Sequence, residues 1–139
     1  MSAAGLAFLY AATAAIFVCA DLVGLNMIVK QVFMRDAAPL FLDEVRAIPA
    51  LLFYLSYVAG LVWFVSAPAL QRGDSLMGAF ITAAGFGAVA YGAYEFTNLA
   101  TLAAWTRAMA CVDLLWGALL SGVSTVGALG LARRVLKTS

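Results

Sequence analysis

The sequence predicts an all-α integral membrane protein, a four-helix bundle with four transmembrane helices and short loops. Two observations support this fold class. Of the 139 residues, 65% are hydrophobic and only 11% are charged, whereas soluble domains are about 45–50% apolar and about 25% charged. Four apolar runs are also roughly 20 residues long, the length that a helix needs to cross the ~30 Å hydrocarbon layer of a bilayer.

The four spans follow one another along the whole chain. They are expected at about residues 5–29, 49–67, 76–101 and 108–132. No Lys or Arg precedes the first run, so it is expected to be a permanent helix and not a signal peptide. The loops are a mixed-charge segment from Lys30 to Ile48, a turn from Pro68 to Ser75 and the link "LAAWTR", in which Trp105 is expected to anchor at the membrane interface. Residues 1–139 are thus expected to form a single transmembrane domain.

The composition excludes several classes of function. A formal net charge of +1 gives no electrostatic basis for binding nucleic acid. The chain has no histidine, which excludes imidazole metal ligands and histidine-based acid–base catalysis. Its two cysteines, Cys19 and Cys111, are too few for a zinc or iron–sulfur site and are expected to be small core residues. We therefore expect no metal and no cofactor, and the sequence assigns no catalytic residue.

The basic residues are shared equally between the two sides of the membrane. The side with both termini carries Arg72, Arg133, Arg134 and Lys137, and the opposite side carries Lys30, Arg35, Arg46 and Arg107. The positive-inside rule therefore does not separate the sides by number. The tail "ARRVLK" is the segment of purest positive charge, and it favours an orientation with both termini in the cytoplasm.

Three acidic residues lie inside the predicted spans. Asp21, Glu95 and Asp113 each cost roughly 2.5–3.5 kcal/mol at the centre of a membrane helix. Asp21 comes late in the first helix, Glu95 late in the third, and Asp113 early in the fourth. Because these helices alternate in direction, all three acids are expected in the same half of the bilayer, next to the first and third loops.

The spacing of small and polar residues predicts which way the acids face. Tyr91, Glu95 and Asn98 share one stripe of the third helix, which continues back through Ala84, Gly87 and Ala88. On the fourth helix, Asp113 begins a stripe of small residues, Gly117, Ser121 and Thr125, of the kind that lets membrane helices approach closely. Both acids are therefore expected to face the interior, with Arg46 and Arg107 as candidate counter-ions.

The polar residues have two interpretations. Interhelical hydrogen bonds between them would stabilise a small bundle without any further role, each contributing about 0.6 kcal/mol. That interpretation fits Asn26, Thr101, Ser121 and Thr125. Ionisable residues within membranes usually mark a site, so the three acids favour a function. The candidate ligand-binding residues are Asp21, Tyr91, Glu95, Asn98, Asp113 and Trp116.

Two motifs resemble a known family. The third helix carries Tyr-x-x-Tyr-acid-x-Thr-Asn in "YGAYEFTNLATL", and the fourth carries Asp-x-x-Trp-Gly in "VDLLWG". Together with the acidic first helix and "PALLFYLSYVAGL" in the second, they make the chain similar to the uncharacterised bacterial membrane family named domain of unknown function 2177. Members usually carry aspartate where this chain has Glu95. The resemblance implies the four-span fold and the bacterial cytoplasmic (inner) membrane, but no activity.

Three functional hypotheses follow. The first is a one-sided polar pocket that binds or transports a small amphipathic or lipid-like molecule, in a protein surrounded by membrane lipids. A homodimer is compatible with this hypothesis, with contacts supplied by the Gly/Ser face of the fourth helix or the Ala/Gly face of the third. The second is an enzyme that uses paired carboxylates on a lipid substrate, although the chain has no recognised catalytic signature. The third is an accessory subunit whose polar residues bind a partner membrane helix.

Overall fold

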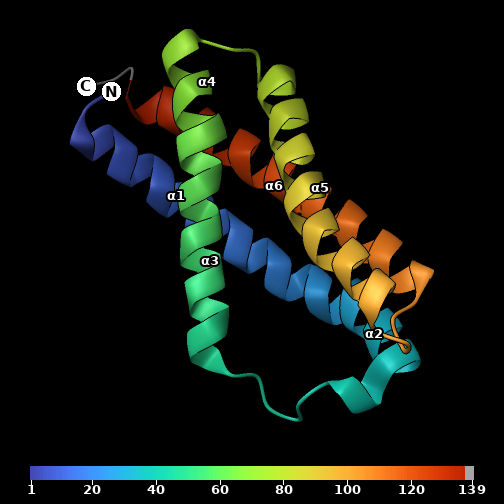
Figure 1. Cartoon of the computed structure of the whole chain (residues 1–139). Coiled ribbons are helices and arrows are strands. Elements are labelled where there is room, and N and C mark those ends of the chain that lie inside the picture. The colour runs from blue at the N-terminus through green and yellow to red at the C-terminus, as the bar shows by residue number, and fades with distance from the viewer. Residues whose placement is uncertain (137–139) are drawn as a thin grey trace.

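The computed structural model describes residues 1–136 and consists of four helical rods, with no strand in that part of the chain (Figure 1). The first rod runs from α1 (Ala3–Gly24) through a π-helical turn (Leu25–Val29) into α2 (Lys30–Ala37) and a 3-10 turn (Ala38–Leu40). The second joins α3 (Ala47–Leu61) through a π-helical turn (Val62–Ser66) to α4 (Ala67–Arg72). The others are α5 (Leu76–Thr101) and α6 (Arg107–Val135).

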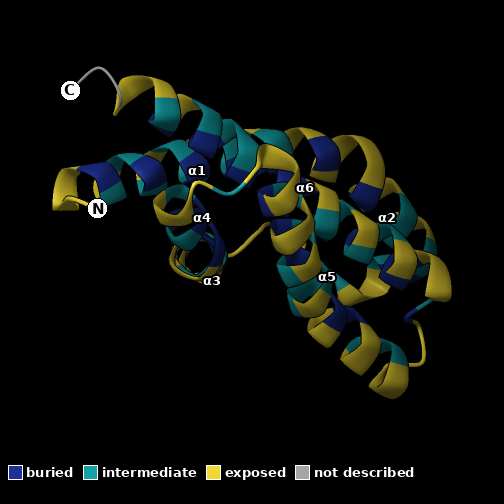
Figure 2. Ribbon diagram, turned by 90° about the horizontal axis from the view of Figure 1, so that it is seen from above, coloured by how far each residue is buried: buried dark blue, intermediate teal, exposed yellow. Residues whose placement is uncertain are grey.

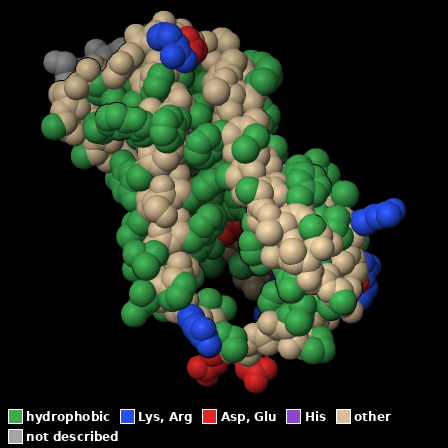
Figure 3. Space-filling view, in the orientation of Figure 1, with side chains coloured by type: hydrophobic (Ala, Val, Ile, Leu, Met, Phe, Trp, Pro, Cys, Tyr) green, Lys and Arg blue, Asp and Glu red, His purple; other side chains and the backbone are tan. Residues whose placement is uncertain are grey.

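All four rods are long and apolar enough to cross a membrane, which confirms the predicted fold class. Their outer surface is largely hydrophobic (Figure 3), with side chains as large as Trp63, Ile81 and Val89 more than half exposed. Exposed apolar area of this extent is unfavourable in water but matches the hydrocarbon interior of a bilayer. The chain is therefore an integral membrane protein.

The first rod extends beyond its predicted end at residue 29. It remains helical to Leu40, over 38 residues, because no glycine or proline interrupts the sequence between Gly24 and Pro39. At 1.5 Å per residue this rod is roughly 57 Å long, against ~30 Å of hydrocarbon. The charged residues of α2 can therefore lie outside the hydrocarbon layer while remaining helical.

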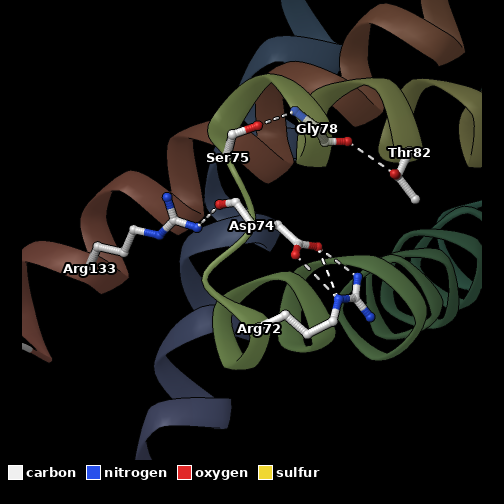
Figure 4. Close-up of polar contacts among 6 residues, drawn as sticks. All are labelled: Arg72, Asp74, Ser75, Gly78, Thr82 and Arg133. Carbon is white, nitrogen blue, oxygen red and sulfur yellow. Dashed lines mark hydrogen bonds and ion pairs between the residues drawn. The ribbon is translucent and has the colours of Figure 1, made fainter.

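The second rod also ends later than predicted, at Arg72 instead of residue 67. Pro68 does not begin the turn, because it lies in the first turn of α4, where a missing backbone N–H is tolerated. The helix ends at Gly73, whose φ of 71° is the left-handed conformation typical of a glycine helix cap. Ser75 then begins α5, and its hydroxyl accepts a hydrogen bond of 3.0 Å from the Gly78 amide (Figure 4).

The small-residue stripes of α5 and α6 pack against each other. A Cβ on Gly87 would lie 2.4 Å from the carbonyl oxygen of Gly117 and 2.5 Å from the Ser121 hydroxyl, so the two backbones are in direct contact. This confirms that these stripes are packing faces. Because they are occupied within the chain, these two faces are not free to supply the contact of a homodimer, which the sequence had left open as a possibility.

The other two rods cover this pair unequally. α1 packs along α6 so that the start of α1 and the end of α6 lie at the same end of the molecule (Figure 1). α3 packs through its second half, where Tyr57, Val58 and Leu61 are buried, while its first half is mostly exposed. Figure 2 looks down this rod and shows α3 and α4 end-on beside α1. The first half of α3 is therefore loosely packed against the rest of the bundle. Cys19 and Cys111 are exposed on the outer surface, so the expectation that they lie in the core was wrong.

Candidate functional site

The three intramembrane acids point into the bundle. Asp21 is 6% exposed, Glu95 is fully buried, and Asp113 is 9% exposed. They come from α1, α5 and α6 respectively. The prediction that Glu95 and Asp113 face protein and not lipid is therefore confirmed, and Asp21 is buried in the same way.

Both carboxylate oxygens of Asp21 are occupied by partners from other helices. The Tyr54 hydroxyl on α3 donates to Oδ2, and the Trp116 indole on α6 donates to Oδ1 at 2.9 Å. The indole lies directly against Gly24, where an added Cβ would come within 2.1 Å of the ring. Asp21 thus connects three helices, and Trp116, which was predicted to bind a ligand, is one of its two hydrogen-bond donors.

Glu95 has one partner and one free oxygen. Its Oε2 accepts a hydrogen bond of 2.7 Å from the Trp105 indole, whereas its Oε1 is buried with no hydrogen-bond partner among the described residues. Trp105 is only 7% exposed and packs against Phe33, Phe41 and Tyr94. The expectation that Trp105 anchors the protein at the membrane interface was therefore wrong, because its ring closes over the buried acid.

Asp113 lies beside Glu95. The two carboxyl groups interact directly, and Asp21 is near enough to add to the negative potential at Asp113. Tyr91 is within electrostatic reach of both aspartates, and its ring packs on Gly117, where a Cβ would lie 2.2 Å from the ring. The three acids therefore belong to one polar cluster.

No basic side chain neutralises this cluster among the described residues. Arg46 and Arg107, which were expected as counter-ions, are exposed and form no ion pair with any of the three acids. At the same end of the bundle, Asp36 of α2 pairs with Arg35 at 2.6 Å and accepts a hydrogen bond from the Thr106 hydroxyl. These contacts join α2 to the start of α6 beside Trp105 but contribute no charge to the cluster.

A cavity of about 360 Å³ reaches the cluster from the side of the bundle. It is lined by Phe53 of α3, by Ala90, Tyr91 and Tyr94 of α5, and by Asp113 of α6. Phe53 and Tyr94 are 45% and 51% exposed, so the mouth lies on the outer surface of the bundle. Figure 3 shows this side, with a hollow between α3 and α5 and acidic atoms visible in its depth.

A wider hollow of about 780 Å³ lies at the opposite end, among the start of α1, α4 and the end of α6. Its polar lining includes Gln71 and Arg133, and it contains no acidic residue. Nearby, the Arg133 guanidinium donates to the backbone carbonyl of Asp74, whose carboxylate pairs with Arg72 at 2.7 Å (Figure 4). These interactions close the loop between α4 and α5, and we give this hollow no role in the site.

The family of the chain is established by a direct comparison. A family model described as "Predicted membrane protein (DUF2177)" matches residues 6–130, a range that contains all three intramembrane acids. The chain belongs to this family. No curated protein and no solved structure matches the sequence significantly. For this DUF2177 member, the chemistry of the site therefore rests on its own residues.

The structure distributes the six predicted ligand-binding residues over three environments. Tyr91 and Asp113 line the cavity, and Glu95 lies behind Asp113. Asn98 interacts with Tyr94 on the same helix and does not line the cavity. The Trp116 indole donates a hydrogen bond to Asp21. The sequence interpretation did not assign Phe53, Ala90 and Tyr94 to the site, because aromatic and small residues in a membrane helix carry no signal that separates a pocket from a lipid-facing surface.

Proposed function

We propose that this DUF2177 protein binds a small amphipathic or lipid-like molecule in the cavity between α3, α5 and α6. The cavity of about 360 Å³ with Asp113 in its wall is the observation that supports this function. Ligand sites in proteins commonly measure about 300–1,000 Å³ and combine a mainly apolar lining with a few polar groups. Here the lining is aromatic apart from one alanine and one carboxyl group.

The carboxyl pair formed by Asp113 and Glu95 supports a ligand with a polar end. A buried polar atom without a hydrogen bond costs about 1–3 kcal/mol, and Oε1 of Glu95 is such an atom. Structures retain these atoms where a function requires them. A polar group that enters the cavity would meet the carboxyl group of Asp113, with Glu95 directly behind it.

The loose packing of α3 supports access from the membrane. Phe53 lies in the exposed first half of α3, and the π-helical turn Val62–Ser66 separates that helix from the better-packed α4. Such π-helical turns are frequent at functional sites. A molecule dissolved in the bilayer could therefore reach Asp113 between α3 and α5 without crossing the aqueous phase.

The test is to fill the cavity without changing the acids. In Ala90→Trp the indole would occupy the cavity, whereas in Val89→Trp it would point outward, because Val89 is 76% exposed. We expect mass spectrometry to find a small molecule or lipid that co-purifies with the wild type and with Val89→Trp but not with Ala90→Trp. Equal co-purification with both variants, each monodisperse and helical, would contradict a site at this place.

We also propose that the protein lies in the bacterial cytoplasmic membrane with both termini in the cytoplasm. Arg72, Arg133 and Arg134 lie at the termini end, and Lys137 of the basic tail falls outside the described residues. In this orientation the acidic cluster would occupy the outer half of the bilayer. A reporter fused after Ser139 that is active only in the cytoplasm should be active, and an alkaline phosphatase fused there should not.

A further inference from the structure

We propose that the polar end of the ligand is an organic cation, an amine or quaternary ammonium group, and that its binding displaces one proton from the Glu95–Asp113 pair. This inference rests on the proposed function and names the chemical class of its ligand. The observation that carries it is the juxtaposition of two carboxyl groups with an aromatic cavity, where no basic side chain of the described residues is paired with either acid.

The charges that face the pair are all acidic or neutral. Asp21 approaches from α1, and Tyr91 and Tyr94 approach from α5. From α3, the Tyr54 hydroxyl is directed to Asp21. Among the described residues, neither an arginine nor a lysine is paired with Glu95 or Asp113. Among the described residues an anionic ligand would find no positive charge here, whereas a cation would meet carboxyl groups that can take up its charge.

The aromatic lining fits the same class of ligand. The rings of Phe53 and Tyr91 stand at 76° to each other with their centroids 6.4 Å apart, so they form two walls of a corner. Tyr94 lines the cavity from one turn further along α5. Aromatic faces attract ammonium groups through their quadrupoles, and cages of aromatic rings are the usual binding sites for quaternary ammonium ligands. Asp113 adds a carboxylate at the same place.

Charge neutrality links cation binding to proton release. A membrane-embedded carboxylate needs a counter-ion, and none is paired with these acids among the described residues, so a proton on the pair is the charge that an entering cation can replace. When an ammonium group enters, the O–H bond of one carboxyl group breaks and its electron pair stays on the carboxylate. The proton leaves to water, and the cation takes its place with no change in the net charge of the site.

Binding and proton release can be measured together on the whole protein. The protein is placed in micelles of an uncharged maltoside detergent, and decyltrimethylammonium is titrated calorimetrically in two buffers of different ionisation enthalpy, with protein-free micelles as the blank. We expect about one proton released per cation bound, and affinity that weakens as the pH is lowered. Decanol and decyl sulfate serve as neutral and anionic amphiphiles of the same chain length.

The variants separate this inference from the proposed function. Asp113→Asn should abolish proton release and weaken cation binding about tenfold or more while leaving decanol binding intact. Asp43→Asn, in an exposed loop, should behave as the wild type. If decanol binds to the wild type as tightly as the cation does and no proton is released, the inference is overturned. In that case the proposed function is still supported if Ala90→Trp abolishes decanol binding. If no probe binds the wild type, the proposed function fails as well.

Discussion

The indole nitrogen of Trp105 donates a hydrogen bond of 2.7 Å to Oε2 of Glu95. Trp105 lies in the short connection between α5 and α6, and Glu95 is fully buried in α5. The connection therefore supplies a hydrogen bond to one oxygen of an intramembrane carboxyl group that interacts with Asp113. This contact therefore holds one member of the acidic pair in place.

Replacement of Trp105 with phenylalanine should destabilise the protein through this hydrogen bond. The variant keeps an aromatic ring against Phe33 and Phe41 but leaves Glu95 without a donor, at an expected cost of about 1–3 kcal/mol in the free energy of unfolding. Trp63→Phe is the matched control, because Trp63 is 67% exposed. Thermal unfolding in detergent measures the difference. Equal midpoints for the two variants would show that the hydrogen bond contributes nothing.

Two glycines of α5 should respond differently to alanine. A Cβ on Gly87 would lie 2.4 Å from the Gly117 carbonyl oxygen, whereas a Cβ on Gly85 would meet nothing within 4 Å. We expect Gly87→Ala to lower the free energy of unfolding by about 1–3 kcal/mol, because α5 and α6 must separate. Gly85→Ala should be neutral or slightly stabilising. Indistinguishable unfolding curves would contradict the direct backbone contact.

The hydroxyl of Tyr54 should hold the first half of α3 against the bundle. Tyr54→Phe removes the donor to Oδ2 of Asp21 and leaves the ring in place. We expect faster hydrogen–deuterium exchange across Ala47–Leu61, because this segment has few other buried contacts. Ser56→Ala is the control, since the Ser56 hydroxyl bonds only to carbonyls of its own helix. Unchanged exchange in Tyr54→Phe would show that packing alone positions α3.

The loop at the termini end should make stability depend on pH. The Arg72 guanidinium, by its hydrogen bond, holds the pKa of Asp74 below its ordinary value. A carboxyl group whose pKa is lower in the folded state stabilises the fold above the unfolded pKa of about 3.9 and loses that effect as the pH falls through the folded pKa. Asp74→Asn should therefore be less stable than the wild type at neutral pH.

The difference in stability between Asp74→Asn and the wild type should disappear as the pH falls through the folded-state pKa of Asp74. The measurement is the unfolding midpoint of both proteins as a function of pH, with Asp43→Asn as a control for an exposed acid. If the unfolding midpoints of Asp74→Asn and the wild type still differ at low pH, the ion pair is excluded as the cause of the difference.

Much of the fold was predictable because hydrophobic length is a strong signal in membrane proteins. The spans at 76–101 and 108–132 agree closely with α5 and α6. The first two rods were drawn too short, at residues 29 and 67. Hydropathy reports where a helix leaves the hydrocarbon layer, whereas a helix ends where the backbone is interrupted, here near Pro39 and at Gly73.

The acids of the site were predictable, but most of their partners were not. Spacing alone placed Glu95 and Asp113 on interior faces, because small residues recur with them every three or four positions. The bond between Tyr54 and Asp21 depends on the rotation of α3, which has apolar residues all round and therefore no periodicity to reveal its buried face. Trp105 was misassigned for a similar reason, since a tryptophan near a helix end fits either a membrane interface or a buried hydrogen bond.

Photolabelling tests the central claim most directly, namely that an amphiphile occupies the cavity beside Asp113. A decanol analogue carrying a diazirine is photoactivated in membranes that contain the protein, and the attachment sites are mapped by mass spectrometry. We predict labelling concentrated on Phe53 and Tyr94, lost in Ala90→Trp and retained in Val89→Trp. Labelling spread over lipid-facing residues such as Ile81 and Val89, with no change in Ala90→Trp, would contradict the account.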